Sequence, residues 1–94
     1  MDTKTQEFYD RLKEQLETER TWPNEYLFKF IVPGDPKKVA QVEEHFDGLK
    51  ADIQLRNSSS NNFTSVSVRV QMKSAQAIVD KYIALSTIEG LMSF

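Results

Sequence analysis

The 94-residue chain has no cysteine, one histidine, one tryptophan, three glycines and three prolines. Without cysteine it can form no disulfide, no thiolate nucleophile and no cysteine-ligated zinc or iron–sulfur site. His45 has no second histidine with which to form a His-Glu-x-x-His motif, and glycine-rich phosphate loops are missing. We therefore expect no catalytic residues, no metal and no cofactor, and an enzyme that uses His45 with Glu44 or Asp47 is the weakest alternative.

Long apolar runs and a surplus of positive charge are also missing. Twelve lysines and arginines stand against fourteen aspartates and glutamates, a formal net charge of −2. Proteins that bind nucleic acid or anionic membranes need a basic face, so the balance disfavours both partners. The chain has no run of about 18 apolar residues, which is the length that spans a membrane. Its N-terminal charges alternate in sign, unlike those of a secretory signal. We expect a cytoplasmic protein without a membrane partner.

The chain does have clear periodicity. From Thr3 to Glu19, apolar residues recur every four positions at Phe8, Leu12 and Leu16, as on one face of an amphipathic helix. Pro23 ends this pattern, because proline disfavours a helical conformation at the residue before it. We assign residues 1–21 to an N-terminal helix and residues 22–94 to the domain that follows.

That domain opens with the segment "YLFKFIVPGDPKK". Tyr26–Val32 alternates as a strand, and Asp35 and Pro36 suit the N-cap and first position of a helix that ends near Gly48. The remaining elements are strands at Asp52–Arg56 and Thr64–Met72, a helix from the N-cap Ser74 to Leu85, and a short apolar segment at Ile88–Phe94. The order predicts an α+β, ferredoxin-like βαββαβ fold, with a four-stranded antiparallel sheet and both helices on one face.

Alternation also identifies the face of the sheet that these helices leave open. It carries Leu27, Lys29, Ile31, Phe63 and Arg69, which form a candidate interaction surface. Either the N-terminal helix or another subunit could cover it, and periodicity does not decide between them. An alternative is an RNA adaptor that uses Phe63, Lys29 and Arg69, although the basic-Gly-Phe-Gly-Phe motif of RNA-recognition sheets is absent.

The turn after the first strand is a candidate effector site, made of Gly34, Asp35, Lys37 and Lys38. A helix N-terminus presents unpaired N–H groups and partial positive charge, to which the two lysines add. Asp35 also explains the turn without a ligand, because an N-cap carboxylate accepts hydrogen bonds from those same N–H groups. Structural capping and ligand binding both stay open.

In this order of elements, "YLFKFIVPG" followed later by "NNFTSVSVRV" resembles the YbeD-like family, small bacterial proteins of unknown function with an ACT-like fold. The resemblance covers residues 22–94 and rests on Trp22-Pro23, Lys29 and Phe63-Thr64-Ser65. In this family, glycine commonly precedes the aromatic residue that opens the third strand. That aromatic residue is Phe63 here, and Asn61 and Asn62 precede it. Asparagine tolerates positive φ, so the same turn is compatible with this sequence.

The resemblance implies a regulatory role, because ACT domains bind amino acids near the turn between the first strand and the first helix, often at a dimer interface. Pro33-Gly34 is similar to the Pro-Gly of that turn. We therefore expect a non-enzymatic regulatory or interaction domain that binds a small effector near Gly34, or that pairs with itself or another protein.

Overall fold

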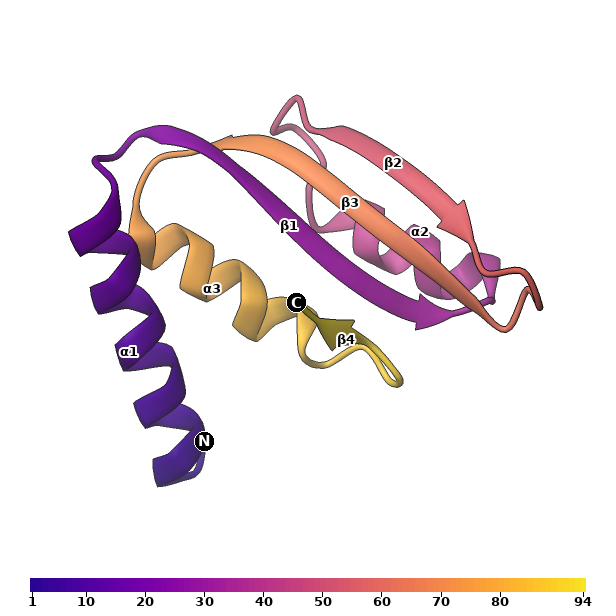
Figure 1. The fold of residues 1–94 in the computed structure, drawn as a ribbon, viewed down its shortest axis with the longest axis horizontal. Coiled ribbons are helices and arrows are strands. Elements are labelled where there is room, and N and C mark those ends of the chain that lie inside the picture. The colour runs from indigo at the N-terminus through magenta and orange to yellow at the C-terminus, as the bar shows by residue number, and fades with distance from the viewer.

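A computed structural model describes all residues, Met1–Phe94. The elements are α1 (Thr3–Glu19), β1 (Asn24–Pro33), α2 (Pro36–Glu44), β2 (Asp52–Asn57), β3 (Phe63–Met72), α3 (Ala75–Leu85) and β4 (Met92–Ser93), shown in Figure 1. The predicted α+β order, with an extra helix before βαββαβ, is confirmed. No helix is long and apolar enough to cross a membrane.

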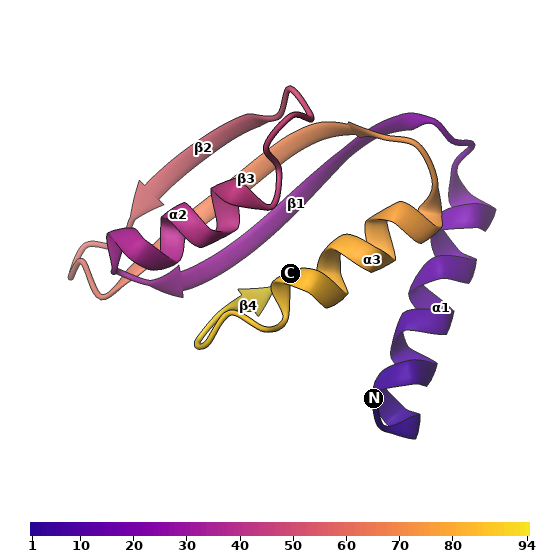
Figure 2. The same cartoon turned by 180° about the vertical axis from the view of Figure 1, so that it is seen from behind.

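The four strands form one sheet in the order β2-β3-β1-β4, and every neighbouring pair is antiparallel. The central pair is the longest, running from Asn24 opposite Met72 to Pro33 opposite Phe63. Seen from behind, α2 and α3 lie on the same side of these strands (Figure 2). This arrangement gives the sheet one covered face and one open face, as the ferredoxin-like order requires.

The core lies between the sheet and the two helices. Strand alternation places Phe28, Phe30 and Val32 of β1 and Val66 and Val68 of β3 on the covered face, where all five are buried. Each such side chain contributes about 1.5–3 kcal/mol relative to an exposed position. The helices supply the other half of the core with Val39, Val42, Ile78, Tyr82 and Leu85.

One polar pair lies at the edge of this core. The hydroxyl groups of Tyr26 and Tyr82 are 2.9 Å apart, and Tyr82 also packs against Phe28 and Phe30. Burial, and then the hydrogen bond with Tyr26, raise the pKa of the Tyr82 hydroxyl well above its ordinary value. The pair therefore satisfies a buried polar group that would otherwise destabilise the core.

The helix starts follow the predicted capping residues. The Asp35 carboxylate accepts a hydrogen bond from the Lys37 N–H at 2.9 Å, and the Ser74 hydroxyl accepts one from the Ala77 N–H at 3.0 Å. The end of α2 differs from the expectation, because α2 ends at Glu44 and the chain reaches Gly48 through turns. Phe46 is nevertheless buried, so the apolar stripe continues beyond the helix.

The N-terminal helix packs beside α3 and not over the open face of the sheet (Figure 1). Leu16 is buried in the core cluster, while Tyr9 and Leu12 pack against that cluster with part of their surface exposed. The Trp22 indole N–H donates to the Leu16 carbonyl at 3.2 Å, which ties the end of α1 to the start of β1. The open face is left uncovered as a result.

Candidate functional site

Gly34 is held against the loop between β2 and β3. Its N–H donates to the Asn62 carbonyl at 2.9 Å, and a Cβ atom added to it would lie 2.2 Å from the Asn61 carbonyl oxygen. No side chain fits at that distance, so the close approach of the loop requires glycine here. The choice of residue at position 34 is explained by packing.

The first N–H groups of α2 already have partners. The Lys37 N–H donates to the Asp35 carboxylate, and the N–H groups of Lys38 and Val39 donate to the Asp35 carbonyl at 2.9 and 3.3 Å. Pro36 has no N–H to offer. Because an anion at a helix N-terminus binds through such groups, this turn has no free backbone donor for it.

A hollow of about 400 Å³ nevertheless lies beside Gly34, between α2 and β2. We call it the turn hollow; it is lined by Gly34, Pro36, Val39, Glu43, Leu55, Asn57, Asn61 and Thr64. Lys38 lines a different hollow, with His45 and Glu89, and Lys37 is exposed. Of the four residues predicted for the effector turn, only Gly34 lines this hollow, and Glu43 is its one ionisable residue.

The turn hollow borders a free edge of the sheet. The Ser58 N–H donates to the Phe63 carbonyl at 2.9 Å, toward β3. In an antiparallel pair, every second residue directs its backbone N–H and C=O groups toward the partner strand. These groups therefore point toward β3 at Asp52, Gln54 and Arg56 as well. Ile53, Leu55 and Asn57 direct theirs outward, where no strand follows. The Leu55 side chain is 51% exposed at this edge.

The open face carries its predicted residues in rows set by the register. Lys29 lies opposite Ser67 of β3, which lies opposite Gln54 of β2. In the next row Ile31 lies opposite Ser65, which lies opposite Arg56.

The far side of both rows is formed by the last residues of the chain. Met92 pairs with Ile31, and the Phe94 N–H donates to the Lys29 carbonyl at 3.0 Å. The structure therefore adds Arg56, Met92 and Phe94 to the predicted open-face set. Alternation from Ile53 and Leu55 could have indicated Arg56, whereas a two-residue strand gives no comparable signal for Phe94.

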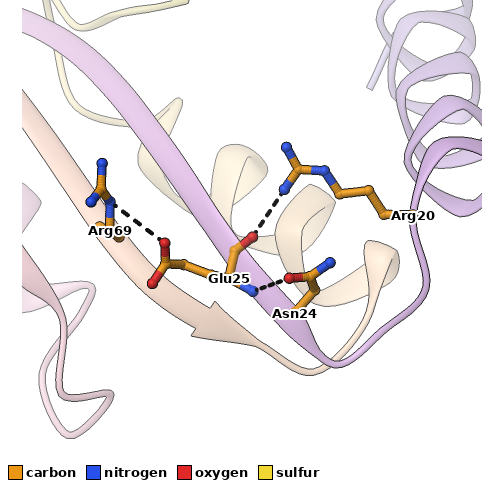
Figure 3. Close-up of polar contacts among 4 residues, drawn as sticks. All are labelled: Arg20, Asn24, Glu25 and Arg69. Atoms are coloured by element: carbon orange, nitrogen blue, oxygen red, sulfur yellow. Dashed lines mark hydrogen bonds and ion pairs between the residues drawn. The ribbon is translucent and has the colours of Figure 1, made fainter.

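Arg69 lies on the open face and forms an exposed ion pair with Glu25. Its Nε atom is 3.6 Å from a Glu25 carboxylate oxygen on the neighbouring strand (Figure 3). The Arg20 guanidinium donates to the Glu25 carbonyl at 3.0 Å, and the Asn24 side-chain oxygen accepts from the Glu25 N–H at 2.7 Å. Both charged groups of the ion pair are largely exposed, so the pair contributes little to stability, about 0–1 kcal/mol.

The three residues of the RNA alternative are spread along the face. Phe63 lies in the row of Pro33, four residues along β1 from Lys29, which is about 13 Å in an extended strand. Leu27, in the row of Arg69, is also exposed. The structure thus separates the predicted aromatic residue from the predicted lysine and places Phe94 next to that lysine instead.

His45 is engaged at the end of α2. Its Nδ1 atom lies 2.7 Å from the Gln41 carbonyl oxygen, and its own carbonyl accepts a hydrogen bond from the Lys81 ammonium group. No group of three or more histidine, aspartate or glutamate side chains is arranged to hold a metal ion. The contacts of His45 are those of a residue that ends a helix.

Comparisons with known proteins agree with this geometry. The chain is similar to the ACT domain from GTP pyrophosphokinase of Chlorobium tepidum, with a TM-score of 0.53 and 8% identity, over 73% of this chain and 94% of that chain. At this identity the likeness shows the fold alone. No curated protein matches the chain in sequence. A family model described as "Protein of unknown function (DUF493)" matches residues 17–94, which includes the whole sheet but little of α1. The chain therefore belongs to this family of proteins of unknown function, the YbeD-like family, and has the ACT-like fold that its sequence predicts.

Proposed function

We propose that the protein is a small non-enzymatic regulatory domain that pairs with a second copy along β2 and binds a small effector in the turn hollow. One observation carries the proposal: the turn hollow borders a free sheet edge that presents a half-exposed leucine. The ACT likeness supports it, because ACT domains bind amino acids near the equivalent turn, often at a dimer interface.

The β2 edge is self-complementary. In an antiparallel pair centred on Leu55, the outward backbone groups of Ile53 face those of Asn57 in the second copy, and the two leucines meet on the helix side. On the open side, Gln54 lies beside Arg56 of the second copy, so no like charges face each other. The edge also lacks proline, which commonly blocks such pairing.

The effector class follows from the lining of the turn hollow. Its volume of about 400 Å³ suits a small molecule. Glu43 favours a cationic group, and the Asn57 side-chain oxygen already accepts from the Thr64 hydroxyl at 2.9 Å. Val39 and Leu55 supply apolar contacts. A small amine with a short apolar group, such as an amino acid, therefore fits better than a nucleotide.

The pairing is tested by the concentration dependence of molar mass in sedimentation equilibrium. Burying the exposed half of Leu55 in both copies is worth about 2 kcal/mol in total, so Leu55→Lys should raise the dimer Kd about 30-fold or more. Leu49→Lys is the matched control, because Leu49 is 39% exposed and lines a hollow with α3 and the end of β3. A wild-type chain that stays monomeric at millimolar concentration refutes the pairing.

The effector site is tested by NMR titration with amino acids and with nucleotides. We expect saturable shifts of the Gly34 and Asn57 amide signals with an amine, and weaker binding in Glu43→Gln. Glu44→Gln is the control, because Glu44 lines a different hollow. Equal binding by the two variants contradicts the proposed site, and this result is independent of the sedimentation result.

A further inference from the structure

We infer that the open sheet face carries a second binding site, for a small organic anion with an aromatic or aliphatic group. The site is a hollow of about 590 Å³ on the side of the sheet opposite to α2 and α3. We call it the open-face hollow, and the residues that define it are Lys29, Gln54, Arg56, Ser65, Ser67 and Phe94. It does not depend on the effector or the pairing proposed above.

The hollow exists because side-chain size changes across the sheet. Ser65 and Ser67 lie on the central strand β3, between longer side chains on β1 and β2. Small residues in the middle and long residues on both sides leave a depression whose floor carries two hydroxyl groups. These hydroxyls can donate hydrogen bonds to a bound anion. The uncovered position of this face, with α1 packed beside α3, leaves the depression accessible.

The side chains that line the hollow carry only positive charge. Lys29 and Arg56 are its two ionisable side chains, and no acidic residue lines it. The ion pair between Arg69 and Glu25 lies in other rows and involves neither cation. Strand spacings put the Cα atoms of Lys29 and Arg56 about 12 Å apart, so both long side chains can reach one anionic group above the serines. Lysine and arginine together bind carboxylate and phosphate groups strongly in such a position.

An apolar wall adjoins these cations. Phe94 lies opposite Lys29 and is 70% exposed, and Ile31 continues the wall in the next row. A ligand with an aromatic or aliphatic body would cover this surface while its anionic group meets the cations. A long polyanion fits less well, because two cations on a chain of net charge −2 release few counterions.

The test is an NMR titration of the full chain with phenyl phosphate and with benzoate, which separate a phosphate from a carboxylate ligand. Inorganic phosphate and benzyl alcohol each supply one half of the proposed chemistry. We expect saturable shifts of the Ser65, Ser67 and Phe94 amide signals with at least one of the two aromatic anions. Binding of inorganic phosphate and of benzyl alcohol should each be about tenfold weaker or more, because each lacks one set of contacts.

The variants assign the binding to the hollow. Lys29→Gln and Arg56→Gln should each weaken it about tenfold, since each removes one charge-assisted hydrogen bond. Lys37→Gln is the control, an exposed lysine on the other side of the sheet, and should bind as the wild type does. All three positions are exposed, so the variants should keep the dispersed spectrum of a folded chain.

Three results would overturn the inference. The first is the absence of a saturable response to either aromatic anion. The second is equal affinity of Lys29→Gln and Lys37→Gln. The third is tighter binding of an oligouridylate than of phenyl phosphate and benzoate at the same amide signals, which would favour the RNA alternative.

Discussion

The replacement Gly34→Ala should destabilise the fold strongly although Gly34 does not need positive φ. The added Cβ would lie 2.2 Å from the Asn61 carbonyl oxygen, so the β2–β3 loop must retreat by about 1 Å. This overpacking costs about 1–3 kcal/mol. The retreat also lengthens the hydrogen bond from the Gly34 N–H to the Asn62 carbonyl, now 2.9 Å, which adds about 1 kcal/mol. We expect a loss of about 2–4 kcal/mol in the free energy of unfolding.

Gly48→Ala provides the matched control. Gly48 has a φ of +80°, but no atom lies within 4 Å of a Cβ added there. Its replacement should therefore cost only the left-handed strain of alanine, about 1–2 kcal/mol. Urea unfolding followed by circular dichroism measures both variants, and the melting temperature of Gly34→Ala should fall by about 10–30 °C. If Gly48→Ala is at least as destabilising as Gly34→Ala, the packing explanation of Gly34 is refuted.

Three further predictions concern the core, α1 and the helix cap. Because folding raises the pKa of Tyr82, its contribution to the free energy of unfolding should be intact below about pH 10 and fall above it. In urea unfolding, Tyr82→Phe should lose less stability than the wild type above about pH 10. Leu16→Ala should cost about 2–4 kcal/mol, whereas Phe8→Ala, at a side chain 58% exposed, should change the urea midpoint little; equal effects would contradict the observed docking of α1. Asp35→Ala should cost about 1 kcal/mol and Asp35→Asn less, because asparagine still caps the helix; thermal melts separate the two.

The fold could be predicted from the sequence because its central strands alternate over many residues. In β3, every second residue from Thr64 to Met72 is buried, and a shift by one position would bury Arg69 and Gln71. Aspartate and serine at the N-caps fixed two helix starts in the same local way. The predicted end of α2, near Gly48, was less accurate, because the buried Phe46 continues the apolar pattern past the last helical residue, Glu44.

The sites were harder to predict because their geometry depends on contacts between distant segments. Gly34 and Asn61 are far apart in sequence, and only the folded loop shows why glycine is required. The ion pair of Arg69 with Glu25 joins two strands diagonally, and no sequence pattern distinguishes a paired arginine from a free one. Phe94 reaches the open face through a two-residue strand, too short for alternation to give its register.

The open-face hollow and the proposed pairing edge both use β2, so anion binding and pairing can change each other's strength although neither requires the other. Asn57 of β2 lines the turn hollow, Gln54 and Arg56 line the open-face hollow on the other side of the sheet, and Leu55 lines both. If two copies pair along β2, Gln54 of the second copy lies beside Arg56, so pairing changes the surroundings of one of the two cations that hold the anion. Because the dimer would hold two such hollows, linkage requires a saturating anion to change the dimer Kd by the square of the factor by which pairing changes the affinity of each hollow. Sedimentation with and without saturating phenyl phosphate measures the first factor, and titration of the wild type at protein concentrations below and above the dimer Kd measures the second. If both factors equal one, the anion site and the pairing edge are not coupled through β2.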